Sequence, residues 1–436
     1  MSIETLSILV LFFSFMGLLA YGVPVAYSIG ISTTLTLLIN ISYMPGITTV
    51  SQRMTTGIDN FALLAIPFFI LAGEIMNRGG IANRLINLAK SLIGSLPGGL
   101  AYVNIISAML FGAVSGSAIA AASAIGSTLT DKMAKDGYPR EFSAAVNISS
   151  STTGLLIPPS NVLIIFALAS GGTASVAALF IAGYIPGIMV GLAIMLMVFY
   201  YAKKKGLPKD GRVSFKKLLI DLKNAVLSLT LLVIVVGGIV AGVFTATEAA
   251  AIAVVYAILL GFWNRELKFR DFRPILLSSA KTTAIVMFLI ATSMAMSWLF
   301  SFQSIPQSLT GFLLESVKDP ILVLLFINIT LLIVGTFMDM TPAVLIFTPI
   351  FLPVVMAMGM HPVHFGMVIV LNLCIGVCTP PVGTLLFVGS GVAQVPITKV
   401  IKPLLPFLGV MVMVLMILTY IPELSLWLPR VFGLIE

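Results

Sequence analysis

Apolar segments long enough to cross a membrane recur along the whole chain, and they constrain its fold more than any other feature. About twenty consecutive apolar residues span the hydrocarbon core of a bilayer as a helix. Of the 436 residues, 59% are apolar and only 9% are charged, whereas about a quarter of the residues in a soluble domain carry a charge. The sequence therefore predicts an all-α polytopic protein embedded in a lipid bilayer and excludes a soluble domain with a single anchor.

Turn residues and charges divide these segments into two similar sets. Two long apolar segments, 100–129 and 321–356, are interrupted near their middle by small or polar residues. We predict crossings in the first set at 8–21, 25–41, 61–76, 142–170 and 174–201, and in the second at 225–242, 248–262, 283–300, 363–393 and 403–420. The resulting repeats are residues 1–202 and 224–436, joined by a basic cytoplasmic linker at 203–223.

The basic residues orient these segments, because short cytoplasmic loops are rich in Lys and Arg. If the two interrupted segments are re-entrant hairpins that open to opposite sides, all Lys and Arg residues except Arg53, Lys318 and Arg430 fall in the cytoplasm. The net charge of +8 then reflects topology, and no nucleic-acid partner is expected. Five crossings per half place both termini outside and insert the halves with opposite orientation, a common plan of secondary transporters.

Glycine and proline landmarks support an internal repeat. Gly112 and Gly335 lie at the two predicted hairpin tips, and Pro158-Pro159 and Pro380-Pro381 interrupt the helices that follow them. The order of these landmarks is the same in both halves, which favours inverted repeats. Few other positions match, so chance similarity between apolar segments is the alternative.

Four places at membrane depth interrupt the helical pattern, namely 112–117, 149–160, 335–342 and 376–383. Their backbone N–H and C=O groups cannot be satisfied by lipid and need protein, water or a ligand. Helix N-termini suit anions, whereas freed carbonyls and hydroxyls suit small cations. We therefore predict one binding site near the bilayer midplane, where the two halves meet.

Hydroxyls, carbonyls and one carboxylate are the candidate ligands at these places. An isolated Ser or Thr in a membrane helix commonly bonds to a carbonyl of the preceding turn, but five consecutive hydroxyls followed by Gly and Pro-Pro favour a site. We predict cation ligands at Ser115, Ser117, Ser149, Ser150, Thr152, Gly154, Gly335, Asp339, Thr341, Gly376 and Thr379. We predict substrate contacts at Ser117, Ser151, Thr153, Ser160, Asp339, Met340 and Pro381.

Asp339 is the only carboxylate in either predicted hairpin tip, and no Lys or Arg lies in the four interrupted places. A charge at that depth is costly unless it has a partner. A bound cation or polar groups of the substrate are the expected partners, and hydrogen bonds to the tip backbone are the alternative.

Other polar residues have simpler interpretations. Glu74 precedes Arg78 by one helical turn, which predicts an ion pair near the inner face. Glu248 follows Thr245 and predicts a capped helix start. Cys374 and Cys378 lie in an apolar segment without His or carboxylate neighbours, which indicates helix packing rather than a disulfide or zinc site.

The four interrupted motifs resemble those of the large membrane subunit of tripartite ATP-independent periplasmic (TRAP) transporters. They are Gly-Ala-Val-Ser-Gly-Ser at 112–117, Ser-Ser-Ser-Thr-Thr-Gly-Leu-Leu-Ile-Pro-Pro-Ser at 149–160, Gly-Thr-Phe-Met-Asp-Met-Thr-Pro at 335–342 and Thr-Pro-Pro-Val-Gly at 379–383. The resemblance covers essentially the whole chain. It implies an elevator-type importer of an organic anion, such as a C4-dicarboxylate or sialic acid, driven by a sodium gradient.

The resemblance also implies the partners and the location. A small four-helix membrane subunit, expected as a separate chain, and a periplasmic substrate-binding protein would act with this chain in a bacterial inner membrane. The two polar tips could bind about two Na⁺ ions, and no organic cofactor is expected.

Three other functions stay open on the sequence. A stand-alone carrier of dicarboxylates or citrate would share the two-hairpin plan but need no binding protein. An intramembrane enzyme using a serine of 149–151 would lack a paired His or Lys, because His361 and His364 are expected in the external loop after the second hairpin. A passive channel would conduct without a coupling gradient.

Overall fold

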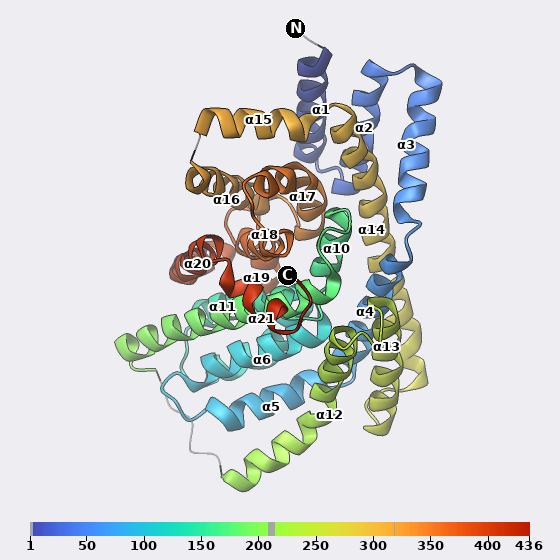
Figure 1. The fold of residues 1–436 in the computed structure, drawn as a ribbon. Coiled ribbons are helices and arrows are strands. Elements are labelled where there is room, and N and C mark those ends of the chain that lie inside the picture. The colour runs from blue at the N-terminus through green and yellow to red at the C-terminus, as the bar shows by residue number, and fades with distance from the viewer. Residues whose placement is uncertain (1–2, 208–213, 318) are drawn as a thin grey trace.

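The computed structural model describes residues 3–207, 214–317 and 319–436, and within these ranges it contains helices and no strands (Figure 1). This confirms the predicted all-α class. The helices are α1 (Ile3–Ala20), α2 (Val25–Asn40), α3 (Tyr43–Ile58), η1 (Phe61–Leu64), α4 (Ala65–Arg78), α5 (Ile81–Ile93), α6 (Gly99–Ser115), α7 (Ala118–Lys135), α8 (Arg140–Ser151), α9 (Thr153–Leu156), α10 (Asn161–Ala169), α11 (Val176–Lys205), α12 (Phe215–Val240), α13 (Ala246–Trp263), α14 (Phe269–Phe302), α15 (Ile305–Val317), α16 (Pro320–Phe337), α17 (Met340–Ala357), α18 (Pro362–Gly376), α19 (Thr384–Ala393), α20 (Ile397–Tyr420) and α21 (Glu423–Val431).

Membrane-spanning helices are abundant in the described part of the chain. Eight helices are long and apolar enough to cross a bilayer, and a ninth span results if the bent pair α8–α9 and α10 is counted as one. The helices α16 and α17 each satisfy this criterion, although the sequence predicts that together they form a re-entrant hairpin. Length does not separate a re-entrant helix from a crossing one, so the predicted topology stays a prediction.

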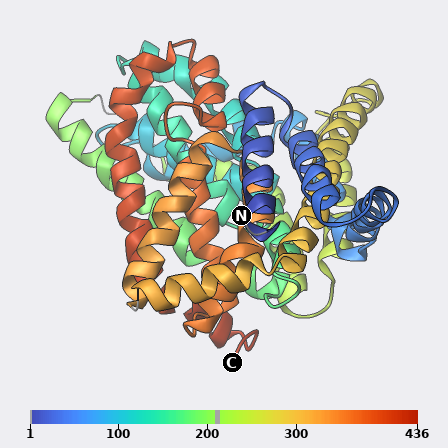
Figure 2. The ribbon, with the colours of Figure 1, turned by 90° about the horizontal axis from the view of Figure 1, so that it is seen from above.

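The helices pack into two groups (Figures 1 and 2). One, here called the framework group, contains α1 to α4 and α12 to α14, in which α4 packs on α13 and α14 packs on α2, α3 and α4. The other, here called the hairpin group, contains α6 to α11 and α16 to α21. Helices α5 and α15 lie between the groups, because α5 packs on α6 and α12 while α15 packs on α14, α16 and α17.

The hairpin group contains two helical hairpins, each followed by a broken helix. The first hairpin, α6–α7, turns at Gly116, whose φ of 62° suits glycine. The second, α16–α17, turns between Phe337 and Met340. Breaks follow at Pro158-Pro159, where the chain bends by 51°, and at Pro380-Pro381. Proline ends a helix because it has no N–H and restricts the residue before it.

Each hairpin contacts its broken helix through a pair of glycines. A Cβ on Gly154 would lie 2.4 Å from Cα of Gly112, and a Cβ on Gly376 would lie 2.6 Å from Cα of Gly335. Both contacts join backbone to backbone, so a side chain could be accommodated only if the helices moved apart. Gly154, Gly335 and Gly376, predicted as cation ligands, are thus also required for close packing.

Buried hydrogen bonds strengthen the same two contacts. The hydroxyl of Ser150 on α8 donates to Oδ1 of Asn104 on α6 at 3.1 Å. In the second half, Nδ2 of Asn372 on α18 donates to Oδ1 of Asn328 on α16 at 2.8 Å. All four residues are buried, and buried polar groups of this kind hold helices in one register. Each hairpin and its broken helix therefore form one packing unit.

The two broken helices also contact each other directly. The thiol of Cys374 on α18 lies 3.6 Å from the carbonyl oxygen of Thr152, and that of Cys378 lies 3.8 Å from the carbonyl oxygen of Ile148. Both cysteines are free and buried, as expected for residues of helix packing.

Several elements differ from the sequence expectation. Helices α3, α5 and α15 were not predicted, because their polar or amphipathic sequences lack the length and hydropathy of a crossing. Helix α14 begins at Phe269, whereas the prediction places a loop up to 282. The predicted linker 203–223 is helical at both ends, since α11 continues to Lys205 and α12 begins at Phe215. Residues 208–213 and Lys318 lie outside the described residues.

Two predictions about polar residues have different outcomes. Thr245 and Glu248 form a capping box at the start of α13, which confirms the predicted cap. His364 is not in a loop: it is buried on α18, where its Nδ1 lies 2.6 Å from the hydroxyl of Ser425 on α21. Helix α18 begins at Pro362, a favoured first helical residue, and so takes in the histidine.

The glycine contacts predict a stability effect. Gly154→Ala and Gly376→Ala should each lower the free energy of unfolding by about 1–3 kcal/mol, because the added methyl overpacks backbone that cannot yield. Gly409→Ala is the matched control, since a Cβ at Gly409 on α20 meets nothing within 4 Å. Thermal unfolding of the purified variants in detergent measures the difference. Equal stability of Gly154→Ala and Gly409→Ala would contradict the close-packing role.

Candidate functional site

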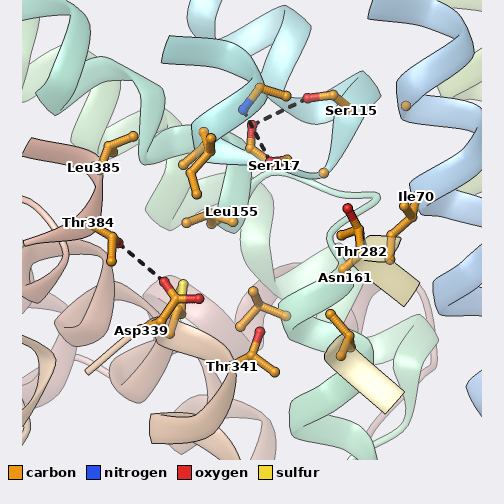
Figure 3. A pocket seen from close by; sticks show the side chains of 18 of the residues that line it. Ile70, Ser115, Ser117, Leu155, Asn161, Thr282, Asp339, Thr341, Thr384 and Leu385 are labelled. Atoms are coloured by element: carbon orange, nitrogen blue, oxygen red, sulfur yellow. Dashed lines mark hydrogen bonds between the residues drawn. The ribbon is translucent and has the colours of Figure 1, made fainter. Parts of the chain in front are cut away.

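A cavity of about 460 Å³ lies between the hairpin group and the framework group. Its lining on one side comes from both hairpin tips and both helix breaks, and on the other side from α4 and α14. Figure 3 shows Ile70 and Thr282 of the framework across the cavity from Asp339 and Thr384 of the hairpin group. Residues from all four interrupted motifs therefore meet at one place.

Four helix N-termini converge on this cavity. Ala118 starts α7, Asn161 starts α10, Met340 starts α17 and Thr384 starts α19, and all four residues line the cavity. The first turn of a helix has backbone N–H groups without intrahelical partners and the positive end of the helix dipole. Such termini bind anions. Two come from hairpin tips and two from breaks after proline pairs, so the motifs themselves create this arrangement.

The tip of the first hairpin presents two serines to the cavity. The hydroxyl of Ser115 lies at 3.5 Å from the carbonyl oxygen of Ser117, to which it donates. The hydroxyl of Ser117 accepts from the backbone N–H of Ala120 at 3.2 Å and thereby caps α7. Both serines line the cavity, as the sequence predicts for residues of a site.

Asp339 presents a carboxylate at the tip of the second hairpin. Its Oδ1 accepts a hydrogen bond from the hydroxyl of Thr384 at 3.3 Å (Figure 3). The side chain is exposed to the cavity, and it does not cap α17 through a hydrogen bond of its own. Met340 and Thr341, also predicted as site residues, line the cavity beside it. Among the described residues of the lining, none is Lys, Arg or His.

The hydroxyl run of the first break lies behind the cavity wall. Ser149, Ser150, Ser151, Thr152 and Thr153 are fully buried, and none of them lines the cavity. Four of these hydroxyls donate to a carbonyl of the preceding turn, at distances from 2.6 to 2.9 Å, and that of Ser150 donates to Asn104. This bonding uses the proton and leaves oxygen lone pairs free, so a cation role for the run stays a prediction. Contact with a substrate in the cavity is not supported in this conformation for Ser151 and Thr153.

Three further predicted residues also lie away from the cavity. The hydroxyl of Ser160 is buried and donates to the carbonyl of Leu155 at 2.7 Å. The hydroxyl of Thr379 donates to the carbonyl of Ile375 at 2.7 Å. Pro381 is exposed, but it is absent from the lining. The second break therefore reaches the cavity through Val377 and Thr384 rather than through Thr379 or Pro381.

Sequence reasoning missed three polar residues of the hairpin group that line the cavity, namely Ser123, Asn161 and Thr384. Thr384 follows the Thr-Pro-Pro-Val-Gly motif and binds Asp339. Asn161 follows Ser160, and its buried Oδ1 has no hydrogen-bond partner in the described chain. Both are the first residues of helices after proline pairs, and the rule that ligands bind at half-helix N-termini would have identified them.

Sequence reasoning also missed the framework side of the cavity. Glu74 on α4 lines the cavity and accepts a hydrogen bond from the hydroxyl of Ser278 on α14 at 3.1 Å. The expected pair with Arg78 is wrong, because no ion pair joins these two residues within the described chain. Glu74 and Arg78 lie one turn apart, but the carboxylate is turned toward α14 and the cavity instead.

No cluster of three or more His, Cys, Asp or Glu residues forms a metal site in the part of the chain described. A cation at the hairpin tips would therefore be bound by hydroxyls, carbonyls and at most one carboxylate. These oxygen ligands suit hard monovalent or divalent cations rather than zinc.

Residues 12–424 match the family described as "Tripartite ATP-independent periplasmic transporter, DctM component". The chain belongs to this TRAP transporter family. It is 50% identical, over 98% of both chains, to a Salmonella typhimurium protein named "Uncharacterized protein YgiK". It is 38% identical to the C4-dicarboxylate TRAP transporter large permease of Rhodobacter capsulatus, over 98% of this chain and all of that one. It is 39% identical to the sialic acid large permease of Vibrio cholerae, over 96% and 98% of the two chains.

A solved structure has a similar fold. The YdaH transporter of Alcanivorax borkumensis, described as having an unusual topology, superposes with a TM-score of 0.64 over 90% of both chains. The sequence identity is 15%, so the likeness concerns the fold alone. The chain is thus a multi-pass membrane protein of the TRAP large permease family.

The geometry predicts which positions water-soluble reagents can reach. Cysteines at Thr341 and Asn77, which line the cavity, should react with a hydrophilic thiol reagent, whereas cysteines at Ser150 and Thr152 should not. The unmodified protein is the control, because Cys374 and Cys378 are fully buried. Mass spectrometry after timed labelling measures the rates. Labelling at Ser150 as fast as at Thr341 would show that the hydroxyl run lines the aqueous cavity.

Proposed function

We propose that the protein imports an organic anion across the bacterial inner membrane by coupling its movement to a sodium gradient. The observation that supports this most is the convergence of four helix N-termini on one cavity that also contains hydroxyls and a single tip carboxylate. Helix N-termini attract an anion, and carboxylate with hydroxyl oxygens attracts a cation. The same cavity therefore suits both members of a coupled pair.

Coupling follows from the charges of the cavity. It holds the carboxylates of Glu74 and Asp339 and no basic side chain among its described lining residues. An organic anion in this cavity would meet net negative charge, which costs free energy in a partly desolvated site. A cation bound beside Asp339 offsets that charge and makes anion binding favourable. About two Na⁺ ions, one near each hairpin tip, are the proposed coupling ions.

The proposed movement is that of an elevator. The hairpin group holds both tips and both breaks, whereas the framework group contributes only α4 and α14 to the cavity. Gly73 on α4 is tightly apposed to the first tip, since a Cβ there would lie 3.0 Å from the carbonyl oxygen of Ser115. Sliding of the hairpin group along the framework would carry the site from one side of the membrane to the other.

The positions of the basic residues indicate which side of the membrane the cavity faces in this structure. The polar framework residues that line it, Glu74, Asn77 and Thr282, lie within one helical turn of Arg78 or Lys281 on the same helices. Because basic residues mark the cytoplasmic side, we infer that the cavity is close to the cytoplasmic face and that this is an inward-facing state. The predicted inverted repeats with both termini in the periplasm belong to the same topology.

The family description names a tripartite periplasmic system, which supports two proposed partners. These are a periplasmic substrate-binding protein and a small four-helix membrane subunit, the latter as a separate chain. Several relatives are named for carboxylates, among them C4-dicarboxylates and sialic acid, and this supports a carboxylate as the proposed substrate. The alternative is a dicarboxylate carrier that needs no binding protein, and uptake in the absence of that protein would reveal it.

Uptake into proteoliposomes tests this function. The reconstituted protein with its membrane partner should accumulate a radiolabelled acid, either succinate or sialic acid, only with an inward sodium gradient and with the cognate binding protein outside. Replacing sodium by potassium should abolish accumulation, because a larger ion does not fit a site built for Na⁺. Accumulation without binding protein would favour a stand-alone carrier, and equilibration without any gradient would contradict coupled transport.

A further inference from the structure

One carboxylate of the framework group lines the cavity, on the side away from the hairpin tips where the ion sites are predicted. Glu74 on α4 is half-buried and lines the cavity together with Asn77 and Thr282. Its hydrogen bond from Ser278 fixes the carboxylate between α4 and α14. Arg78 at the end of α4 and Lys281 within α14 are close in sequence to these lining residues, but neither lines the cavity. Glu74 is thus the only charged framework residue among the described residues of the lining.

The position of Glu74 makes its effect dependent on the state of the carrier. The anion site and Asp339 belong to the hairpin group, whereas Glu74 belongs to the framework group. In this structure both face one cavity. When the hairpin group slides along the framework, the anion moves with the hairpin tips and Glu74 does not. The repulsion between Glu74 and a bound anion therefore acts in this conformation and is weakened in the other.

We propose that Glu74 promotes release of the transported anion into the cytoplasm by lowering the affinity of the inward-facing cavity for organic anions. This inference rests on the proposed function and adds to it a residue that makes the inward-facing and outward-facing states unequal in their affinity for the anion. Ser278 donates a hydrogen bond to the carboxylate from α14 but does not itself line the cavity. The same carboxylate attracts cations, so it disfavours the anion without displacing sodium.

A first experiment measures the affinity of each face. In right-side-out proteoliposomes that contain the full complex, exchange of succinate or of sialic acid gives separate half-saturation concentrations for the internal and external solutions. Glu74→Gln should lower the internal value about fivefold for singly charged sialic acid, an order-of-magnitude figure for charges across a partly hydrated cavity. For doubly charged succinate the fold-change in the internal value should be about the square of that for sialic acid, because the Coulomb energy is proportional to ligand charge. The external value should stay unchanged.

Ser278→Ala is the matched control for a purely structural role. It removes the hydrogen bond between α4 and α14 but keeps the charge of Glu74. If Glu74 acts through charge, Ser278→Ala keeps the internal half-saturation concentration within about twofold of the wild-type value. If Glu74 acts only by joining the two helices, both variants should change the internal and external values alike, which would overturn the proposal.

A second readout does not depend on the identity of the substrate. A cysteine at Ser123, a half-buried lining residue of α7, reports the potential on the hairpin side of the cavity. The rates at which this cysteine reacts with an anionic and with a cationic methanethiosulfonate reagent are measured in two proteins, one with Glu74 and one with Glu74→Gln. The ratio of anionic to cationic rates should rise about tenfold or more, since the two rates respond in opposite directions. Ser278→Ala should leave the ratio within about twofold.

The two readouts separate failure of this inference from failure of the proposed function. Transport of neither acid, together with the expected shift of the labelling ratio, would count against the proposed substrate class while the anion-repelling role of Glu74 stands. Transport of one acid with an internal half-saturation concentration that Glu74→Gln does not change would overturn the inference. An unchanged labelling ratio would overturn it as well.

Discussion

The backbone at the four interrupted places is the constraint on which the rest of the structure depends. Peptide groups that leave a helix inside a bilayer must be satisfied by protein, water or ligand. Here the close contacts Gly112–Gly154 and Gly335–Gly376 place each hairpin against its broken helix, and buried hydrogen bonds at Asn104 and Asn372 join the same elements. The N-termini of α7, α10, α17 and α19, which these interruptions create, face one cavity.

This arrangement separates packing from binding within each motif. The glycines and the hydroxyl run form the buried side, where hydroxyls donate to carbonyls of their own helix. The helix starts form the exposed side, where Ser117, Asp339 and Thr384 face the cavity. Each motif therefore contains residues needed for close packing and residues available to a ligand, which is why single residues of these motifs are ambiguous without the structure.

Much of the fold could be predicted from the sequence because hydropathy and proline directly control it. Long apolar segments predict helices in a membrane, and Pro158-Pro159 and Pro380-Pro381 mark the two breaks that the structure contains. Helices α3, α5 and α15 could not be predicted in this way, since amphipathic helices depend on tertiary packing rather than on hydropathy. The site residues predicted from the sequences of the hairpin tips include Ser115, Ser117, Asp339 and Thr341, all of which line the cavity. Glu74 escaped prediction because only the packing of distant helices brings it there.

The central claim is that a cation beside Asp339 makes this cavity favourable for an organic anion. The most direct test is the sodium dependence of acid uptake by Asp339→Asn, with Asp319→Asn as the matched control. Asp319 caps α16 by accepting from the N–H of Ile321 at 2.9 Å, a role that Asn can also perform, and it is absent from the lining of the cavity. Asp339→Asn should raise the half-saturating sodium concentration or lower uptake by about tenfold or more, whereas Asp319→Asn should behave as wild type. Wild-type sodium dependence in Asp339→Asn would contradict the account.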